Sequence, residues 1–283
     1  MSPLSELDAT ERSALQRVLA EPVFELIPLR NVLQQAGNLP DGATVSVTAS
    51  PQKTLDDTID IAAELQERGF QVIPHLSARM TRDRDHVEHL LGRMADREIT
   101  RAFVIGGDAE FSGDFFDALS LLETMADVGH AIEEIGIGAY PEGHHFFDDA
   151  TALQALHDKQ PHASYMTTQM CFDGPAIGSW LATMRAEGIN LPVHVGLAGV
   201  ADRLKLARIS ARIGVGASLK FLSKHRGLVR SLVGPGGYAP DELLESMASI
   251  LADPAADIAT THIYTFNQVD TTERWRQTYL ESL

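Results

Sequence analysis

The sequence is poor in cysteine, in aromatic residues and in positive charge. Cys171 is the only cysteine among 283 residues, which excludes an internal disulfide and a thiolate metal site. We interpret it as a small buried residue rather than a nucleophile. Acidic residues outnumber basic ones by 39 to 23, so the net charge is −16 and no basic field attracts nucleic acid or an anionic membrane. The few aromatic residues are not interleaved with bases, as nucleic-acid stacking surfaces require.

Long hydrophobic runs are also missing. No stretch approaches the ~20 consecutive apolar residues of a transmembrane helix. The first residues carry acids early and lack the apolar stretch of a signal peptide. Hydrophobic residues nevertheless make up 44% of the chain, which is enough for a large core. These features predict a soluble cytoplasmic protein with neither a nucleic-acid nor a membrane partner.

Short apolar segments alternate with amphipathic segments along the whole chain. Eight of them are predicted as strands: Val23–Pro28, Thr44–Ala49, Phe70–Leu76, Thr100–Gly106, Glu134–Tyr140, Ser164–Met170, Val193–Ala198 and His262–Asn267. Such alternation indicates parallel strands joined by helices. A doubly wound sheet in two domains is the competing arrangement. Because no linker divides the chain, we predict a single (β/α)₈ TIM-barrel domain over residues 1–283. The interval 199–261 leaves room for extra helices before the last strand.

Polar residues gather at the ends of these predicted strands, where a barrel of this type carries its active site. They are Glu25, Thr48, His75, Asp108, Tyr140, His144, Gln169, Thr265 and Asn267, and the apolar Pro28 stands among them. Burial favours the neutral form of a carboxylate, so Glu25 within an apolar strand suits a proton donor. The alternative is a surface-facing glutamate at a strand end.

Other candidates each have a structural alternative. Asp108 follows two glycines that allow close approach to a ligand, but a helix-capping or turn aspartate has the same pattern. His75 alone is more typical of a hydrogen-bonded structural residue. Lys159 offers charge to a cofactor phosphate, or is solvated surface. No HExxH pattern or carboxylate–histidine spacing indicates a metal, so we expect no metal site.

Seven short motifs, in order along nearly the whole chain, resemble the methylenetetrahydrofolate reductase family, which consists of flavin-dependent barrels. They are FELIP at Phe24–Pro28, VTAS at Val47–Ser50, PHLS at Pro74–Ser77, GGD at Gly106–Asp108, AYPEGHH at Ala139–His145, TTQMCFD at Thr167–Asp173 and YTFN at Tyr264–Asn267. Taken alone, PHL and GGD are weak evidence for this resemblance. AYPEGH followed by TQ-x-x-FD is specific, and the conjunction in this order is strong.

The resemblance implies roles for the matching positions. Glu25 corresponds to the acid that protonates a folate nitrogen, and Asp108 to the carboxylate that binds folate and tunes the flavin. Gln169 corresponds to the glutamine that orients folate. The remaining implied FAD contacts are Thr48, His75, Gly107, Asp108, Tyr140, His144 and, after a one-residue gap, Lys159. Members of the family are usually homo-oligomers.

Four positions depart from the family pattern. Gly106 stands where many relatives have an arginine near the FAD diphosphate, and Ala152 where an aspartate often contacts the adenosine. Ile209 replaces a phenylalanine that packs on nicotinamide or folate, a loss of about 0.5–1.5 kcal/mol of aromatic contact. Gln268 replaces an arginine. The lost FAD contacts predict weaker flavin binding or a flavin-independent relative.

The resemblance therefore implies an oxidoreductase of one-carbon metabolism and methionine biosynthesis. It would interconvert 5,10-methylenetetrahydrofolate and 5-methyltetrahydrofolate through bound FAD, with NADH or NADPH as co-substrate. One alternative is a flavin-independent enzyme with direct hydride transfer. The other is a non-catalytic folate- or flavin-binding subunit, against which the retention of Glu25, Asp108 and Gln169 argues.

Overall fold

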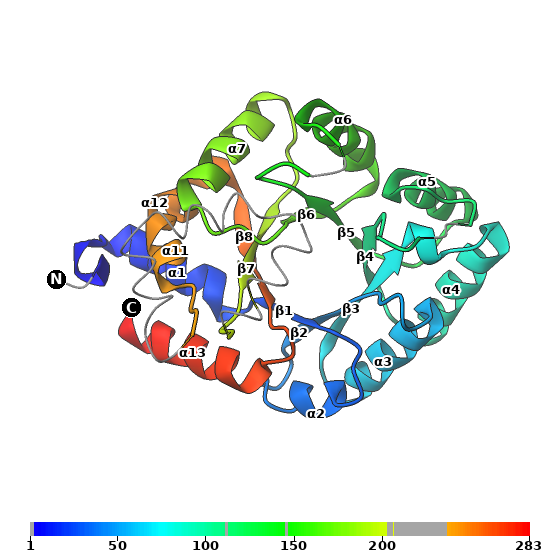
Figure 1. Cartoon of the computed structure of the whole chain (residues 1–283), viewed down its shortest axis with the longest axis horizontal. Coiled ribbons are helices and arrows are strands. Elements are labelled where there is room, and N and C mark those ends of the chain that lie inside the picture. The colour runs from blue at the N-terminus through cyan, green and yellow to red at the C-terminus, as the bar shows by residue number, and fades with distance from the viewer. Residues whose placement is uncertain (1–2, 111–112, 145–146, 203–205, 207–236) are drawn as a thin grey trace.

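Eight parallel strands close into a barrel in sequence order, with β8 paired back to β1 (Figure 1). The structure is a computed structural model and describes residues 3–110, 113–144, 147–202, 206 and 237–283. The strands are β1 (Val23–Leu26), β2 (Thr44–Val47), β3 (Gln71–Ser77), β4 (Arg101–Ile105), β5 (Glu134–Ala139), β6 (Tyr165–Thr168), β7 (Val193–Ala198) and β8 (Ile258–Tyr264). The predicted (β/α)₈ fold is confirmed.

Helices surround this barrel on the outside (Figure 1). The α-helices are α1 (Ala9–Ala20), α2 (Val32–Ala36), α3 (Leu55–Glu67), α4 (Arg84–Asp96), α5 (Ala118–Val128), α6 (Asp149–Lys159), α7 (Gly174–Ala186), α11 (Asp241–Ser246), α12 (Ala248–Ala252) and α13 (Val269–Ser282). Short 3₁₀ helices are η1 (Pro3–Glu6), η2 (Ala78–Met80), η3 (Gln160–His162) and η4 (Pro254–Ala256).

Most of the long helices begin at a side chain that caps their free amides. The capping residues are Asp8, Thr54, Asp83, Asp117, Asp148 and Asp173, for α1 and α3 to α7 respectively. Each accepts a hydrogen bond from the backbone N–H three residues on, which satisfies a donor that the helix itself leaves free. Local sequence therefore fixes where these helices start.

Several predicted strand boundaries were wrong. The largest error is β8, which begins at Ile258 rather than His262 and ends at Tyr264 rather than Asn267. Its polar Thr260–Thr261 pair resembles a loop, but pairing with β7 holds it extended. Phe266 and Asn267 have φ of 51° and 56°, which ends the strand. The remaining strands except β7 differ from prediction by one or two residues at an end.

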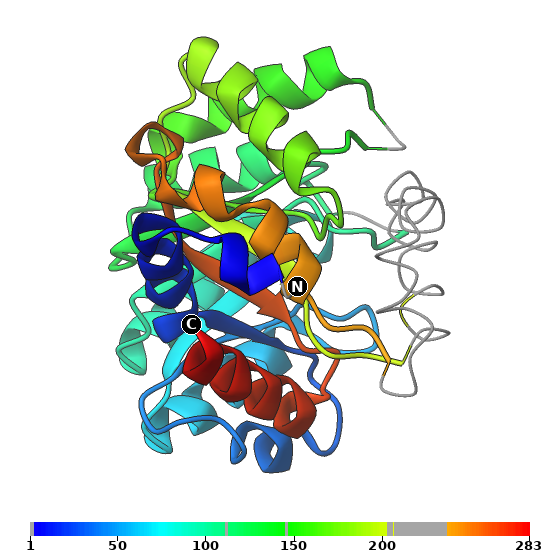
Figure 2. The same ribbon diagram turned by 90° about the vertical axis from the view of Figure 1, so that its left-hand side faces the viewer.

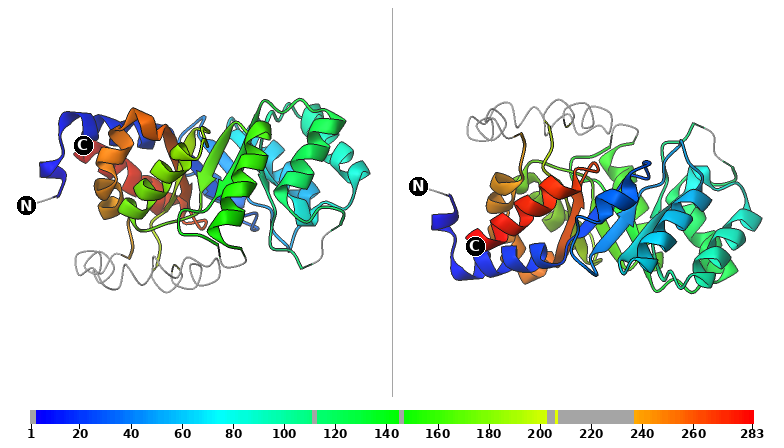
Figure 3. Two further views of the ribbon diagram at one scale, coloured as in Figure 1. Left: turned by 90° about the horizontal axis from the view of Figure 1, so that it is seen from above. Right: turned by 90° about the horizontal axis from the view of Figure 1, so that it is seen from below.

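The extra helices expected before the last strand include α11 and α12. Residues 203–205 and 207–236 of the interval 199–261, Ile209 among them, lie outside the described residues. The N-terminal helix α1 packs against α12 and α13. Figure 2 shows α1 in blue beside α13 in red, and Figure 3 shows α1 next to α12 in orange.

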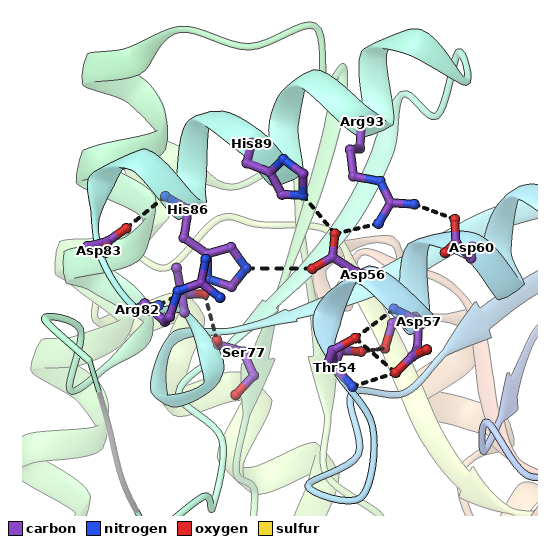
Figure 4. A network of polar contacts seen from close by, with 12 residues as sticks. Thr54, Asp56, Asp57, Asp60, Ser77, Arg82, Asp83, His86, His89 and Arg93 are labelled. Atoms are coloured by element: carbon purple, nitrogen blue, oxygen red, sulfur yellow. Dashed lines mark hydrogen bonds and ion pairs between the residues drawn. The ribbon is translucent and has the colours of Figure 1, made fainter.

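A polar cluster joins α3 to α4 on the outer wall (Figure 4). Arg93 on α4 pairs with both Asp56 and Asp60 on α3. His89 Nε2 lies 2.8 Å from an Asp56 carboxylate oxygen. Burial alone would raise the pKa of Asp56, but hydrogen bonds with His89 and Arg93 together hold it below its usual value. The cluster thus ties two neighbouring helices by mutually satisfied charges.

Candidate active site

The barrel interior changes from apolar to polar around the inward-facing side chain of Glu25. Val23, Ile73, Phe103 and Tyr165 form an apolar cluster. Glu25, two residues along β1 from Val23, faces the same side because side chains alternate in a strand. The register places Glu25 beside Ser46 on β2 and Tyr264 on β8.

Two histidines flank the Glu25 carboxylate. Its Oε2 lies 3.3 Å from His262 Nε2 and 4.0 Å from His75 Nε2. The side chains of His262 and His75 are 4% and 6% exposed, and that of Glu25 is 16% exposed. A carboxyl group with so little solvent depends on these imidazoles for its polar contacts. The alternative of a surface-facing glutamate is wrong.

His75 is held neutral at ordinary pH. Burial lowers its pKa to about 4, against the opposing charge of Glu25. Its Nε2 lies 2.6 Å from the Ser46 hydroxyl, which fixes the ring next to Glu25. Ser46 and His262 were not singled out from the sequence. Each occupies an inward position in an apolar strand, and that signal points to a side chain with a partner inside the barrel.

Residues that follow β8 fasten it to the end of β1. The Thr265 hydroxyl donates to the Glu25 carbonyl at 2.6 Å. The Asn267 side chain accepts from the Ile27 N–H and donates to the Ile27 carbonyl, both at 2.8 Å. Thr265 and Asn267, predicted as site residues, therefore position the strand that carries Glu25.

The turn after β4 is shaped by a close approach that only glycine permits. Gly107 has a φ of +83°, and a Cβ there would lie 2.1 Å from the Ser77 hydroxyl oxygen. The Arg79 N–H donates to the Gly106 carbonyl at 3.0 Å. Asp108 follows as an exposed residue. It does not cap α5, since Asp117 does.

A cavity of about 1040 Å³ opens beside this turn. Its wall includes Gly106, Gly138 and Tyr140 from the ends of β4 and β5, together with the start of α5 and much of α6 and α7. Lys159, on the last turn of α6, also lines it and is 9% exposed. Burial lowers the pKa of Lys159 to about 8, although the Asp117 charge opposes this.

An aromatic group stands at the mouth of the same cavity. The rings of Tyr140 and His144 meet edge to face at 4.8 Å, and His144 stacks on Phe147 at 4.1 Å. Tyr140 and His144, both predicted, are thereby brought together, and Phe147 was missed. The consecutive aromatic residues after His144 in the sequence were the available signal.

The sequence profile of the methylenetetrahydrofolate reductase family matches residues 28–275. The chain belongs to this family. The matched range spans the cavity residues and His262, while Glu25 lies three residues before it. The recognition made from motifs is thus confirmed over nearly the whole chain.

The chain is also similar to solved structures at low sequence identity. Orotidine 5'-monophosphate decarboxylase from Methanocaldococcus jannaschii, crystallised with the inhibitor BMP, is 12% identical with a TM-score of 0.51, and 93% of this chain and 98% of that chain are covered. A Burkholderia cenocepacia J2315 protein assigned as a phosphonomutase is 9% identical with a TM-score of 0.48, covering 97% and 99%. The first similarity supports the barrel architecture only.

The other predicted residues are placed as follows. Thr48 lies just after β2, where its N–H donates to the Leu26 carbonyl. Gln169 lies just after β6, and its side-chain oxygen accepts from the Met170 N–H at 2.8 Å. Cys171 is buried, as expected. Within the described ranges, no helix is long and apolar enough to cross a membrane, and no histidine, cysteine and carboxylate side chains cluster as metal ligands would.

The cavity has the volume for a dinucleotide cofactor, and both a cation and several acids line it. Lys159 supplies a cation that suits a diphosphate. Four acids also line the wall: Asp117, Glu142, Asp149 and Asp158. Ala152 and Gly106, both departures from the family pattern, face this space without adding a cation. The residues present therefore fit FAD, with a weaker electrostatic hold on its phosphates.

Proposed function

We propose that this protein interconverts 5,10-methylenetetrahydrofolate and 5-methyltetrahydrofolate, using FAD held in the cavity and NAD(P)H as co-substrate. The observation that carries the proposal is Glu25, a nearly buried carboxyl group between two imidazoles. Family membership supports a folate reductase, and its members are generally flavin-linked.

Glu25 supplies the proton that this reaction needs. Opening the methylene bridge leaves a basic nitrogen as a poor leaving group, and protonation at that nitrogen assists the opening. His262, 3.3 Å from Glu25 Oε2, orients the carboxyl group, and Ser46 orients the neutral His75 on its other side. A rigid acid of this kind is aligned before substrate binds.

The other residues bind and orient. Asp108, an exposed residue on the turn after β4, offers its carboxylate to a cationic folate intermediate. Gln169 offers an amide to the folate ring, and Lys159 holds phosphate. Bound FAD would supply the hydride carrier between NAD(P)H and folate. The resemblance assigns Thr48, His75, Gly107, Tyr140 and His144 to this cofactor, and of these Tyr140 lines the cavity.

A second candidate is direct hydride transfer from NAD(P)H without flavin. Gly106 and Ala152 favour it, because at both positions the chain lacks a polar contact to FAD that the family pattern implies. In that case Glu25 would keep its role as the acid, since the folate chemistry is unchanged.

The visible spectrum of the purified protein, followed by anaerobic mixing with NADH and then with methylenetetrahydrofolate, tests the proposal. We expect bound flavin at partial occupancy that is bleached by NADH and recovers its colour with folate. Folate reduction by protein proven free of flavin would support direct transfer. Absence of folate reduction with or without added FAD would reject both.

A further inference from the structure

Helix α6 buries fewer of its residues than its neighbours α5 and α7 do. Of its eleven residues only Leu156 and Lys159 are buried. The space beneath it is the cavity, whose opposite side is formed by α7. Small side chains such as Ala152, Ala155 and Ala176 face this space and keep it open. An amphipathic helix normally fills such a gap with its own apolar side chains.

Trp180 of α7 forms part of that opposite wall. It is half-buried and packs against the main core cluster, while another part of the side chain lines the cavity. Packing on the core restricts the indole, so it presents a fixed aromatic surface. Neither the sequence motifs nor the family resemblance singled it out.

Lys159 provides an independent indication of a ligand. Lys159 is 9% exposed as a residue of the cavity wall, and no hydrogen bond or ion pair joins its ammonium group to another described residue. A buried cation without a partner is costly, and an anionic ligand would relieve the cost. The wall therefore combines the Lys159 cation with the indole of Trp180, in addition to the rings of Tyr140 and Phe147.

We infer that Trp180 contacts the adenine of a nucleotide whose diphosphate is held by Lys159. Adenine is planar and stacks on indole, and a diphosphate requires a cation. FAD and NAD(P)H share this ADP half, so the inference rests on the proposed function without choosing between its cofactors. Trp180 is then a specificity-determining residue that distinguishes ligands with adenine from those without it.

Tryptophan fluorescence tests the contact directly, because the chain has two tryptophans. Trp275 lies on α13, donates to Asp241 at 3.0 Å and does not line the cavity. The Trp275→Phe variant leaves Trp180 as the reporter. We expect ADP to quench its emission saturably, and inorganic pyrophosphate to displace ADP without quenching. Failure of ADP to alter the emission, or equal quenching by pyrophosphate, would overturn the inference.

Affinity measurements on apo-protein supply the second readout. In calorimetric titrations, Trp180→Ala should weaken ADP binding about tenfold and leave pyrophosphate binding unchanged, while Trp180→Phe should restore most of the loss. Equal loss for both ligands would mean that the tryptophan only supports the wall, which also overturns the inference. Near-ultraviolet circular dichroism confirms folding of each variant.

Two further experiments are needed. One asks whether FAD or NAD(P)H supplies the ADP group that binds here, and the other tests the proposed function separately from the role of Trp180. Displacement of ADP by FAD or by NADH identifies which dinucleotide uses the wall. A folate-reduction assay on the same Trp275→Phe protein runs in parallel. Quenching by ADP without folate reduction would reject the proposed function alone, whereas folate reduction without an ADP response would reject the role of Trp180 alone.

Discussion

The α3–α4 wall and the α6 wall use polar side chains in opposite ways. Helix α3 buries six residues and α4 five, and the charged residues between them satisfy one another. Helix α6 buries two residues, and one of them is a lysine whose ammonium has no described partner. Paired charges hold two helices together, whereas an unpaired buried charge weakens the apo-protein and strengthens ligand binding. The charged residues of α3 and α4 thus contribute to stability, whereas the buried lysine of α6 contributes to ligand binding.

Glu25→Gln should have the largest effect on catalysis. It tests whether Glu25, inside the barrel, is the acid of the reaction. Reduction of methylenetetrahydrofolate should fall about 10²–10⁴-fold, because Gln keeps the size but cannot donate the proton. Reduction of flavin by NAD(P)H needs no such proton and should continue. Stopped-flow measurement of each half-reaction checks this. Wild-type rates in both halves would show that Glu25 is not the acid.

Lys159→Met tests the binding assignment of the α6 wall. Loss of a charge-assisted hydrogen bond should weaken FAD binding about 10- to 100-fold. The urea midpoint of the apo-protein should stay equal or rise, because a buried charge is removed. Lys159→Arg is the matched control and should retain much of the affinity. A lower urea midpoint with unchanged affinity would place Lys159 with the structural charges.

His194→Phe extends the comparison to the barrel interior, where His194 stacks on Tyr165 at 4.1 Å. Burial, with smaller effects of His262 and Arg101, lowers the pKa of His194 to about 3, below the 6.5 of an unfolded chain. The unfolded state therefore takes up the proton first, and stability falls as pH drops from 6.5 toward 3.

At pH 5 this histidine should cost about 1–2 kcal/mol of unfolding free energy, and His194→Phe should recover it. Urea titrations at pH 8 and pH 5 measure the difference. His130→Gln, at an exposed position, is the control and should leave the pH dependence unchanged. An equal drop from pH 8 to pH 5 in wild type and His194→Phe would contradict the assignment.

Arg93→Met should have the smallest effect. It tests whether the charged residues between α3 and α4 serve stability alone. Removing the partner of Asp56 and Asp60 should lower the unfolding free energy by about 1 kcal/mol and leave folate reduction unchanged. Arg84→Met is a control on the same helix, because the Arg84 side chain is 53% exposed and should contribute little. Equal stability of the two variants would remove the distinction between the walls.

The sequence by itself determined most of the architecture, because helix caps and apolar strand segments are recognised from residues close together in the chain. Capping residues such as Thr54 and Asp148 set helix starts through hydrogen bonds to amides three residues away. Apolar alternation located all eight strands, and ordered motifs located Glu25, Tyr140 and His144. The β8 boundary escaped prediction because Ile258 to Thr261 are extended by pairing with β7 rather than by their own preference.

The tertiary structure alone decided which side chains meet. Glu25 and His262 are 237 residues apart, and closure of β8 on β1 brings their side chains within 3.3 Å. The cavity likewise depends on how α5, α6 and α7 pack around the ends of β4 and β5, and the alanines of α6 do not reveal this by themselves. Sequence periodicity specifies which face of an element is buried. Only chain closure and packing fix what that face meets, because those contacts join residues far apart in the chain.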